Sequence, residues 1–376
     1  MATSIDLPEK MKALVLRSTH EPPSVETIPT PQPTVGSAIV RVLVANTISY
    51  MRDIYNGKRR YPFPTPLVTG TSFIGRVAAV GPDATKIKPG DLVVVDIMIR
   101  SRDEPTDAFL AGVIQGFTEG SAKLMRDVYR DWSYAEYCRA PLENLTLLNE
   151  RRLTGAKQDG GLGYSLSQLA VSSAHMVPYG GLRDIGLQAG QTVVIAPATG
   201  AFGGAAVNVA LAMGARVIAM GRSKDSLAFL KSKIPHPERV ETVPITGDMM
   251  ADCKELKKYG PIDAYFDIGP PEAHASTHIK SCIIALRHGA RISIMGGYRE
   301  DIAIPHSFIM HSNIRIYGKW MYERQDIYDL FKLVESGLLD LSVAEVTGEY
   351  PLEEWKAAWD DAAENARFGQ IALIKP

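Results

Sequence analysis

The sequence is poor in cysteine, and none of its cysteines has the spacing of a metal site. Three occur in 376 residues, Cys138, Cys253 and Cys282, with no CxxC or CxxH pair. Disulfide frameworks and cysteine-rich zinc sites both need closely spaced thiols. A disulfide-stapled protein is therefore not expected, and neither is a cysteine-rich zinc protein.

Charge of one sign and long apolar runs are lacking as well. The formal net charge is −1 at pH 7, which indicates no general attraction to nucleic acid or to an anionic membrane. No apolar run approaches the ~20 residues of a membrane helix. The amino-terminal stretch MATSIDLPEKMKALVLRS has no apolar core of a secretory signal. We therefore expect a cytoplasmic protein that binds neither nucleic acid nor membranes.

The first part of the chain reads as a β domain. Up to about residue 160, runs such as SAIVRVLVA and DLVVVDIM alternate with turns rich in Pro and Gly, which is typical of a barrel-like domain. Between Arg100 and Trp132 this pattern is lost. Segments of this length are either functional, as lids or partner surfaces, or tolerated insertions, and both readings stay open.

From about Gln191 the pattern changes to alternating strands and helices. TVVIAPA and ARVIAMG read as buried strands, with the helix GGAAVNVALAMG between them. Six strands of this kind predict a parallel, doubly wound sheet that binds a dinucleotide, so the fold class is α/β. Two helical patterns and the short strand GQIALIKP follow. This last part is expected to return to the first domain.

A glycine-rich turn joins the first strand of this sheet to its helix. It contains Ala198, Thr199, Gly200, Ala201, Phe202 and Gly203. Gly200 allows the backbone to approach a pyrophosphate, while Gly203 allows the helix to pack closely on the strand. The free N–H groups of the helix start favour an anion. A tight turn without ligand is the alternative.

The end of the second strand indicates the type of cofactor. An NAD site usually has an acidic residue there, but this chain has Gly221, followed by Arg222, Ser223 and Lys224. Glycine leaves room for a 2′-phosphate, and arginine and lysine can pair with it. The prediction is therefore NADP(H). The alternative is that Arg222 and Lys224 only solvate the start of a helix. This alternative would not explain why an acidic residue is missing at Gly221.

Together these segments resemble the medium-chain dehydrogenase/reductase superfamily. The resemblance is carried by MKALVLR, GTSFIGRVAAVG, KPGDLVVV, YAEY, GLQAGQTVVIAPATGAFGGAA and GKW. The Ala-x-Gly-x-x-Gly turn is most similar to the quinone oxidoreductase branch. The resemblance implies a GroES-like β-barrel catalytic domain of residues 1–167 plus 323–376, a Rossmann NADP-binding domain of residues 168–322, and a homodimer. It also extends the cofactor site to Ile268, Gly269, Met295, Gly296, Gly297 and Lys319.

The chain departs from the zinc alcohol dehydrogenases at the metal positions. Their cysteine matches a place near Tyr50, their His and Glu match Thr71 and Ser72, and their second cysteine matches a place near Ser173. The region of their four-cysteine lobe has no cysteine here. Hydroxyl side chains are poor zinc ligands, so the expectation is an enzyme without a metal.

Without a Lewis acid, the oxygen that gains charge during hydride transfer needs hydrogen bonds or a proton. The candidates are Tyr50 as proton donor, with Thr71 and Ser173 as hydrogen-bonding wall residues. The alternative for Tyr50 is plain packing, with its hydroxyl bound to backbone. His274 and His278 are expected on a solvated helix face, not at a metal.

The leading hypothesis is a reductase of a small, activated C=C compound, such as a secondary metabolite, that carries an enone, a quinone or an enoyl group. Two alternatives stay open. One is a ketone or aldehyde reductase that also works as an alcohol dehydrogenase, and the other is a non-catalytic NADPH-binding protein.

Overall fold

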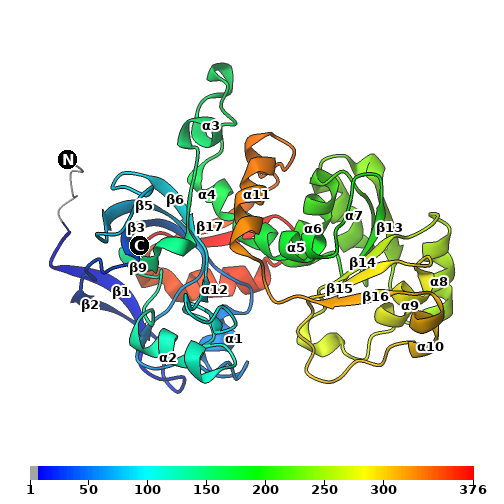
Figure 1. Ribbon diagram of the computed structural model, residues 1–376, viewed down its shortest axis with the longest axis horizontal. Coiled ribbons are helices and arrows are strands. Elements are labelled where there is room, and N and C mark those ends of the chain that lie inside the picture. Colours follow the sequence, from blue (N-terminus) through cyan, green and yellow to red (C-terminus); the bar gives the residue numbers. More distant parts are fainter. Residues whose placement is uncertain (1–6) are drawn as a thin grey trace. The chain divides into compact units, whose positions relative to one another are not determined.

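The computed structural model describes residues 7–376, which divide into two units (Figure 1). The first unit holds residues up to Ser173, together with Ala344–Ala366 and Gln370–Pro376. The second holds Ala174–Val343 and Arg367–Gly369. The predicted boundaries at residues 168 and 323 differ from this division, because residues 168–173 belong to the first unit and residues 323–343 to the second.

The first unit is mainly β. Its strands are β1 (Lys10–Leu16), β2 (Ser24–Pro29), β3 (Ser37–Asn46), β4 (Leu67–Val68), β5 (Phe73–Val80), β6 (Leu92–Val95), β7 (Met98–Arg100), β8 (Ala108–Leu110), β9 (Tyr137–Pro141), β10 (Leu145–Leu147), β17 (Glu345–Tyr350) and β18 (Gln370–Ile374). Its helices are α1 (Met51–Tyr55), α2 (Glu119–Asp127), α3 (Glu150–Thr154), α4 (Leu166–Ala170) and α12 (Trp355–Glu364), with the start of α5 (Ser172–Asp184).

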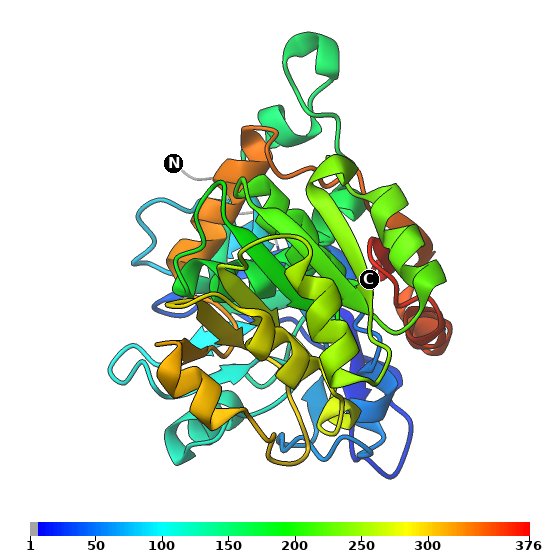
Figure 2. The same cartoon turned by 90° about the vertical axis from the view of Figure 1, so that its right-hand side faces the viewer.

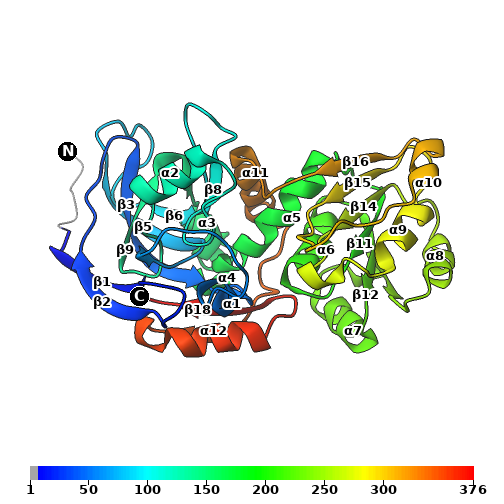
Figure 3. The same cartoon turned by 90° about the horizontal axis from the view of Figure 1, so that it is seen from below.

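The long strand β3 organises this unit. It pairs with β5, β9 and β18 in a sheet of order β10-β6-β5-β3-β18-β17. The terminal strand β18 therefore returns to the first unit, as the sequence predicted, together with β17, which was not predicted. The first of the two predicted carboxyl-terminal helices, residues 324–335, belongs instead to the second unit. Helix α12 packs beside β17 and β18 (Figure 3). This is the GroES-like domain expected from the resemblance.

The second unit contains a six-stranded parallel sheet. Its strands are β11 (Thr192–Ala196), β12 (Arg216–Gly221), β13 (Val240–Pro244), β14 (Ala264–Asp267), β15 (Arg291–Ile294) and β16 (Arg315–Gly318). Its helices are α6 (Ala201–Ala212), α7 (Lys224–Lys233), α8 (Met249–Lys257), α9 (His278–Ala285), α10 (His306–His311) and α11 (Arg324–Glu335), with most of α5.

The strand order β13-β12-β11-β14-β15-β16, parallel throughout, is that of a Rossmann fold. All five residues of β11 are buried, because helices cover both faces of such a sheet. Helices α8, α9 and α10 lie in front of the sheet in Figure 2 and contribute to the core on that face. Ser223 caps α7 by accepting a hydrogen bond from the Ser226 amide.

Two segments differ from their sequence-based description. Residues 100–132 are not one irregular loop, since they contain β8 and α2. The α10 helix was not predicted, because it covers only six residues. No helix within residues 7–376 has the length and apolar character that a membrane span requires.

Candidate functional site

The turn between β11 and α6 provides a helix start with open amide groups. Gly200 is the N-cap of α6 and is exposed, and no side chain caps the helix. The first amide groups of a helix have no partner within the helix, so they are free to bind an anion. A Cβ on Gly200 would meet nothing within 4 Å. This turn therefore fits a phosphate group.

Gly203 serves packing, as the sequence predicted. A Cβ there would lie 2.1 Å from the Pro197 carbonyl oxygen. At Gly204 a Cβ would lie 2.3 Å from Cβ of Phe368. The helix consequently approaches both the strand and the carboxyl-terminal segment as closely as only glycine permits.

The end of β12 lies next to this turn. A Cβ on the buried Gly221 would be 2.8 Å from Cγ2 of Thr199. Arg222, Ser223 and Lys224 are exposed at the start of α7. Neither Arg222 nor Lys224 forms an ion pair with any residue from 7 to 376. Two uncompensated cations thus stand where the sequence predicted the 2′-phosphate.

The remaining predicted cofactor residues follow the carboxyl ends of β14, β15 and β16. They are Ile268, Gly269, Met295, Gly296, Gly297 and Lys319. Parallel strands present their carboxyl ends at one edge, which is where ligands of doubly wound sheets bind. The structure therefore brings these residues to the same edge of the sheet as the glycine-rich turn.

Two of these residues also have neighbours within the protein itself. A Cβ at Gly296 would lie 2.6 Å from Oδ2 of Asp267, so this glycine accommodates a carboxylate of the protein itself. The Lys319 ammonium pairs with Glu323 at 2.8 Å and lies 3.8 Å from Asp184. Its charge is therefore already balanced.

Asp267 is the centre of a buried polar cluster that the sequence did not indicate. Its Oδ1 accepts bonds from the hydroxyls of Tyr298 (2.6 Å) and Tyr265 (2.9 Å). Burial, with the Asp267 charge as second cause, raises the pKa of both tyrosines well above its usual range. Nε2 of His278 lies 3.6 Å from the same oxygen, and His278 is 1% exposed. The expected solvated face for His278 was wrong, because helix α9 begins only at this residue and points it inward.

The segment Arg367–Gly369 was also missed. Its backbone forms an isolated bridge between Arg367 and Gly200. The Arg367 guanidinium lies 5.3 Å from the centre of the Phe229 ring on α7. Arg367 therefore borders the glycine-rich turn, although it is far from it in sequence and no local pattern marks it.

In the first unit, Thr71 and Ser173 meet around Asn46, which the sequence did not single out. The Thr71 hydroxyl donates to the Asn46 backbone oxygen at 2.5 Å. The Asn46 amide donates to Oγ of Ser173 at 2.7 Å, and Ser173 donates to the Ala170 carbonyl. The Asn46 side-chain oxygen is buried without a hydrogen-bond partner. The hydroxyls of both predicted wall residues therefore donate their hydrogen bonds to backbone carbonyl oxygens.

Residues of the segment 100–132, with the adjacent Ser133, form hydrogen bonds to Thr71 and Tyr55. The Thr71 carbonyl accepts bonds from Trp132 Nε1 (3.0 Å) and Ser133 Oγ (2.7 Å). The Tyr55 hydroxyl donates to the Gly112 carbonyl at 2.7 Å. Trp132 and Gly112, from the segment 100–132, therefore contact residues of the predicted site or next to it.

Tyr50 differs from the other two candidates. It is half-buried at the N-cap of α1, and its hydroxyl forms no hydrogen bond within residues 7–376. The Arg59 guanidinium stacks on its ring, 3.6 Å from the centroid. Burial and the nearby Tyr61 raise the pKa of Tyr50 to about 12, and Arg59 opposes this rise. The alternative with the Tyr50 hydroxyl bound to backbone does not match the structure.

The side chains of this region do not fit a zinc ion. The predicted positions carry hydroxyls, and no three His, Cys, Asp or Glu side chains between residues 7 and 376 lie close enough to hold a metal. All three cysteines are buried. Burial raises the pKa of the Cys138 and Cys282 thiols well above its usual range, which disfavours the thiolate that zinc binds.

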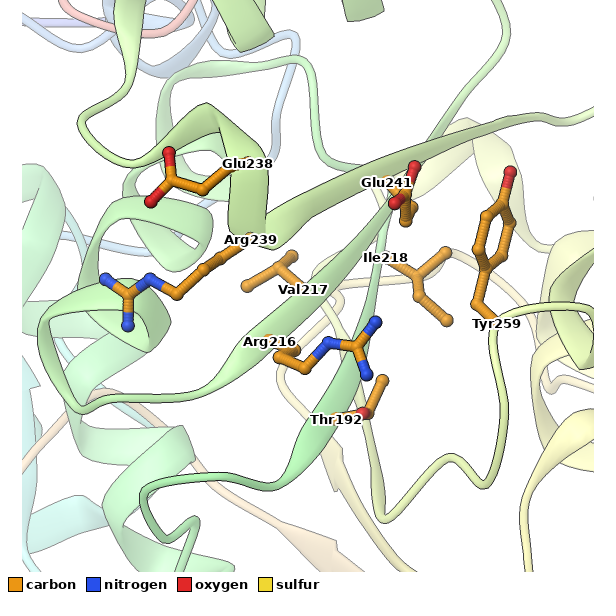
Figure 4. Close-up of a pocket in the computed structure, with 8 residues that line it drawn as sticks. All are labelled: Thr192, Arg216, Val217, Ile218, Glu238, Arg239, Glu241 and Tyr259. Carbon is orange, nitrogen blue, oxygen red and sulfur yellow. The ribbon is translucent and has the colours of Figure 1, made fainter.

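A small cavity lies at the opposite edge of the parallel sheet. Its volume of about 10 Å³ has room for about one water molecule. Figure 4 shows Thr192 and Arg216, the first residues of their strands, beside Glu241 and Tyr259. Its size and place give it no part in the predicted site.

Two family models match the chain. One, described as zinc-binding dehydrogenase, matches residues 201–336, and the other, the alcohol dehydrogenase GroES-like domain, matches residues 36–150. An L-threonine 3-dehydrogenase of Streptomyces coelicolor is 28% identical, covering 96% of this chain and 99% of the relative. An acryloyl-coenzyme A reductase of Metallosphaera sedula is 25% identical with the same coverage.

Solved structures share the fold. A zinc-binding dehydrogenase of Sinorhizobium meliloti bound to NADP superposes with a TM-score of 0.75 at 20% identity, covering 98% of this chain and 100% of the other. An alcohol dehydrogenase of E. coli with NADH reaches 0.76 at 16% identity and the same coverage. With matching models in both units and relatives of the same length, the chain belongs to the medium-chain dehydrogenase/reductase superfamily and is a dehydrogenase or reductase.

Proposed function

We propose that the protein is a zinc-independent, NADPH-dependent reductase of activated C=C bonds in small organic compounds. The observation that carries this proposal is that the Tyr50 hydroxyl has no hydrogen-bond partner within residues 7–376. Of the three candidate hydroxyls, those of Thr71 and Ser173 donate to backbone oxygens, while that of Tyr50 has no partner within residues 7–376. The Tyr50 hydroxyl is therefore available to donate its proton to a substrate.

The preference for NADPH rests on the end of β12. Gly221 leaves space where an acid would repel a 2′-phosphate, and Arg222 and Lys224 supply two unpaired cations. Arg367 adds a third cation beside the glycine-rich turn. When bound, the reduced nicotinamide supplies a hydride. The protein's own groups must then orient the substrate and deliver the proton.

The preference for C=C bonds over carbonyl groups as substrates follows from the chemistry of the hydrogen-bond donors. Reduction of an enone leaves an enolate, which needs less stabilisation than the alkoxide formed from a ketone. A neutral phenol can provide this by hydrogen bonding. With a pKa of about 12, Tyr50 stays protonated at neutral pH and donates only as charge develops. The acryloyl-coenzyme A reductase among the relatives supports the same class of reaction.

Reduction of ketones or aldehydes, with alcohol oxidation as its reverse, is the second candidate. It is favoured by relatives named alcohol dehydrogenase and L-threonine 3-dehydrogenase. Residues 7–376 offer no fitting set of zinc ligands, and this argues for the first candidate, since neither hydroxyls nor amides replace a Lewis acid well.

Oxidation of NADPH in the presence of enones, quinones, enoyl thioesters, ketones and aldehydes tests the proposal. We expect turnover with conjugated C=C compounds and little with simple ketones. Replacing Tyr50 with Phe should lower turnover about a hundredfold, at the lower end of what general acids contribute, while the dissociation constant for NADPH stays unchanged. Faster turnover of alcohols and ketones than of enones would favour the second candidate.

A further inference from the structure

Arg59 is a half-buried cation without an acidic partner. Arg76, which is also half-buried, donates to Glu150, and even the exposed Arg102 donates to Glu143. Arg59 forms no ion pair with any residue from 7 to 376. Desolvating a guanidinium without an anion is costly, and proteins retain such a group where it serves another purpose.

The contacts of Arg59 are aromatic. Its guanidinium lies 3.6 Å from the ring centre of Tyr50, well within the range of a cation–π interaction, and 5.8 Å from that of Tyr61. Nη1 donates to the Tyr61 hydroxyl at 3.1 Å. This bond fixes the plane of the guanidinium against the Tyr50 ring.

The backbone holds the two partners in place. The Arg59 amide donates to the Asp53 carbonyl at 2.8 Å, and the Asp53 amide donates to the Tyr50 carbonyl at 3.0 Å. Tyr50 itself begins α1. The stack is therefore built into the first turn of this helix and the loop after it, and does not depend on a long, mobile side chain alone.

We infer that Arg59 is a positioning residue for proton transfer from Tyr50, stacked on the phenol to stabilise the negative charge that forms there. The inference rests on the proposed function. In the step concerned, the Tyr50 O–H bond breaks as a C–H bond forms at the substrate carbon beside the carbonyl. The electron pair of the O–H bond stays on the phenolate oxygen, which later takes a proton from water. A fixed cation on the ring face lowers the energy of that phenolate.

A second role for the same cation would be to bind an anionic group of the substrate directly. That role needs no communication with Tyr50, so it predicts a different pattern of kinetic effects. The two roles are separated by a double-mutant cycle between positions 50 and 59.

The variants are Arg59→Met and Arg59→Lys, each alone and with Tyr50→Phe. Arg60→Met is the matched control, because Arg60 is an exposed neighbour of the same charge. We expect Arg59→Met to lower kcat about tenfold, which corresponds to one cation–π contact of ordinary strength. Lysine should restore part of the rate, and free guanidinium should partly rescue the Met variant. In the Tyr50→Phe background Arg59→Met should have no further effect.

Several outcomes would overturn the inference: equal losses in both backgrounds, an Arg59→Met rate no lower than that of Arg60→Met, or a raised KM for an anionic substrate with kcat unchanged. The last result would assign Arg59 to substrate binding. Full activity of Tyr50→Phe would instead remove the donor role on which the inference rests.

A measurement without turnover separates the inference from the proposed function. In cofactor-free protein, Tyr50 is replaced with a fluorinated tyrosine, whose phenol ionises at a lower pH where the protein stays folded, and its 19F signal, assigned with Tyr50→Phe, is followed against pH. This signal should titrate at a higher pH in Arg59→Met than in protein that keeps Arg59, and Arg60→Met should leave the titration unchanged. An unchanged titration in folded Arg59→Met or Arg59→Gln protein, in which the cation is removed, contradicts the inference, even if no substrate has been found.

Discussion

Hydrogen-bond partners distinguish the three hydroxyl residues that the sequence placed at the site. Thr71 is 2% exposed and is held from several sides by Asn46, Trp132 and Ser133. Such a residue shapes a wall, because its donor is already used. Tyr50 is the contrasting case, with an aromatic face covered by Arg59 and a hydroxyl left open.

At the same scale, Arg222 is expected to decide between the two nicotinamide cofactors. Arg222→Ala should weaken NADPH binding about ten- to a hundredfold, because charge-assisted hydrogen bonds to phosphate are worth roughly 1.5–3 kcal/mol. NADH has no 2′-phosphate and should lose little. Fluorescence titration with both cofactors measures this, with Arg151→Ala in the first unit as control. Equal losses for NADPH and NADH would exclude the role at the 2′-phosphate.

Among the elements, the approach of α6 to β11 depends on glycine. Gly203 and Gly204 have no space for a Cβ, since Pro197 and Phe368 fill it. This leaves the helix start open for phosphate while its flank is packed against protein. The same element thus contributes to stability through its side and to binding through its end.

Gly203→Ala should therefore lower the free energy of unfolding by about 1–3 kcal/mol, the usual cost of overpacking. It should also weaken cofactor binding, because α6 must shift away from the turn. Gly318→Ala is the control, since nothing lies within 4 Å of its Cβ position. Denaturant unfolding of both variants provides the test. A Gly203→Ala protein as stable as Gly318→Ala would show that the helix can move without cost.

For the whole molecule, the sequence predicted a homodimer, and the parallel sheet offers an edge for it. Strand β16 ends the sheet and is largely exposed, with Ile316 at 38% exposure and Met310 at 55% nearby on α10. An open strand edge with apolar side chains is a ready site for pairing. We expect sedimentation to give the mass of a dimer, and Ile316→Lys to shift it toward the monomer. A monomer at micromolar concentration would contradict this expectation.

A metal analysis also belongs at this scale. We expect purified protein to contain well below one zinc per chain, and chelator treatment to leave NADPH-dependent turnover unchanged. The reason is the ligand set within residues 7–376: hydroxyls stand at the zinc positions, and the three cysteines are buried, with burial raising the pKa of the Cys138 and Cys282 thiols. One tightly bound zinc per chain would refute the zinc-independent part of the proposal, whatever the substrate.

The sequence by itself determined the features that depend on local pattern. The alternation of apolar strands and helices predicted the six-stranded Rossmann sheet, and the glycine turn predicted the tight entry into α6. The missing acid at Gly221 and the missing zinc ligands were likewise readable, since each is a matter of residue type at a known place in a pattern.

Only the tertiary structure decided which polar groups meet. Asn46 between Thr71 and Ser173, Arg367 beside Gly200, and His278 near Asp267 all join residues distant in sequence. Their partners are chosen by strand pairing and burial, which leave no periodic trace in the chain. For the same reason the sequence could name Tyr50 as a proton donor but not the state of its hydroxyl, because that depends on which neighbours the fold brings within hydrogen-bonding distance.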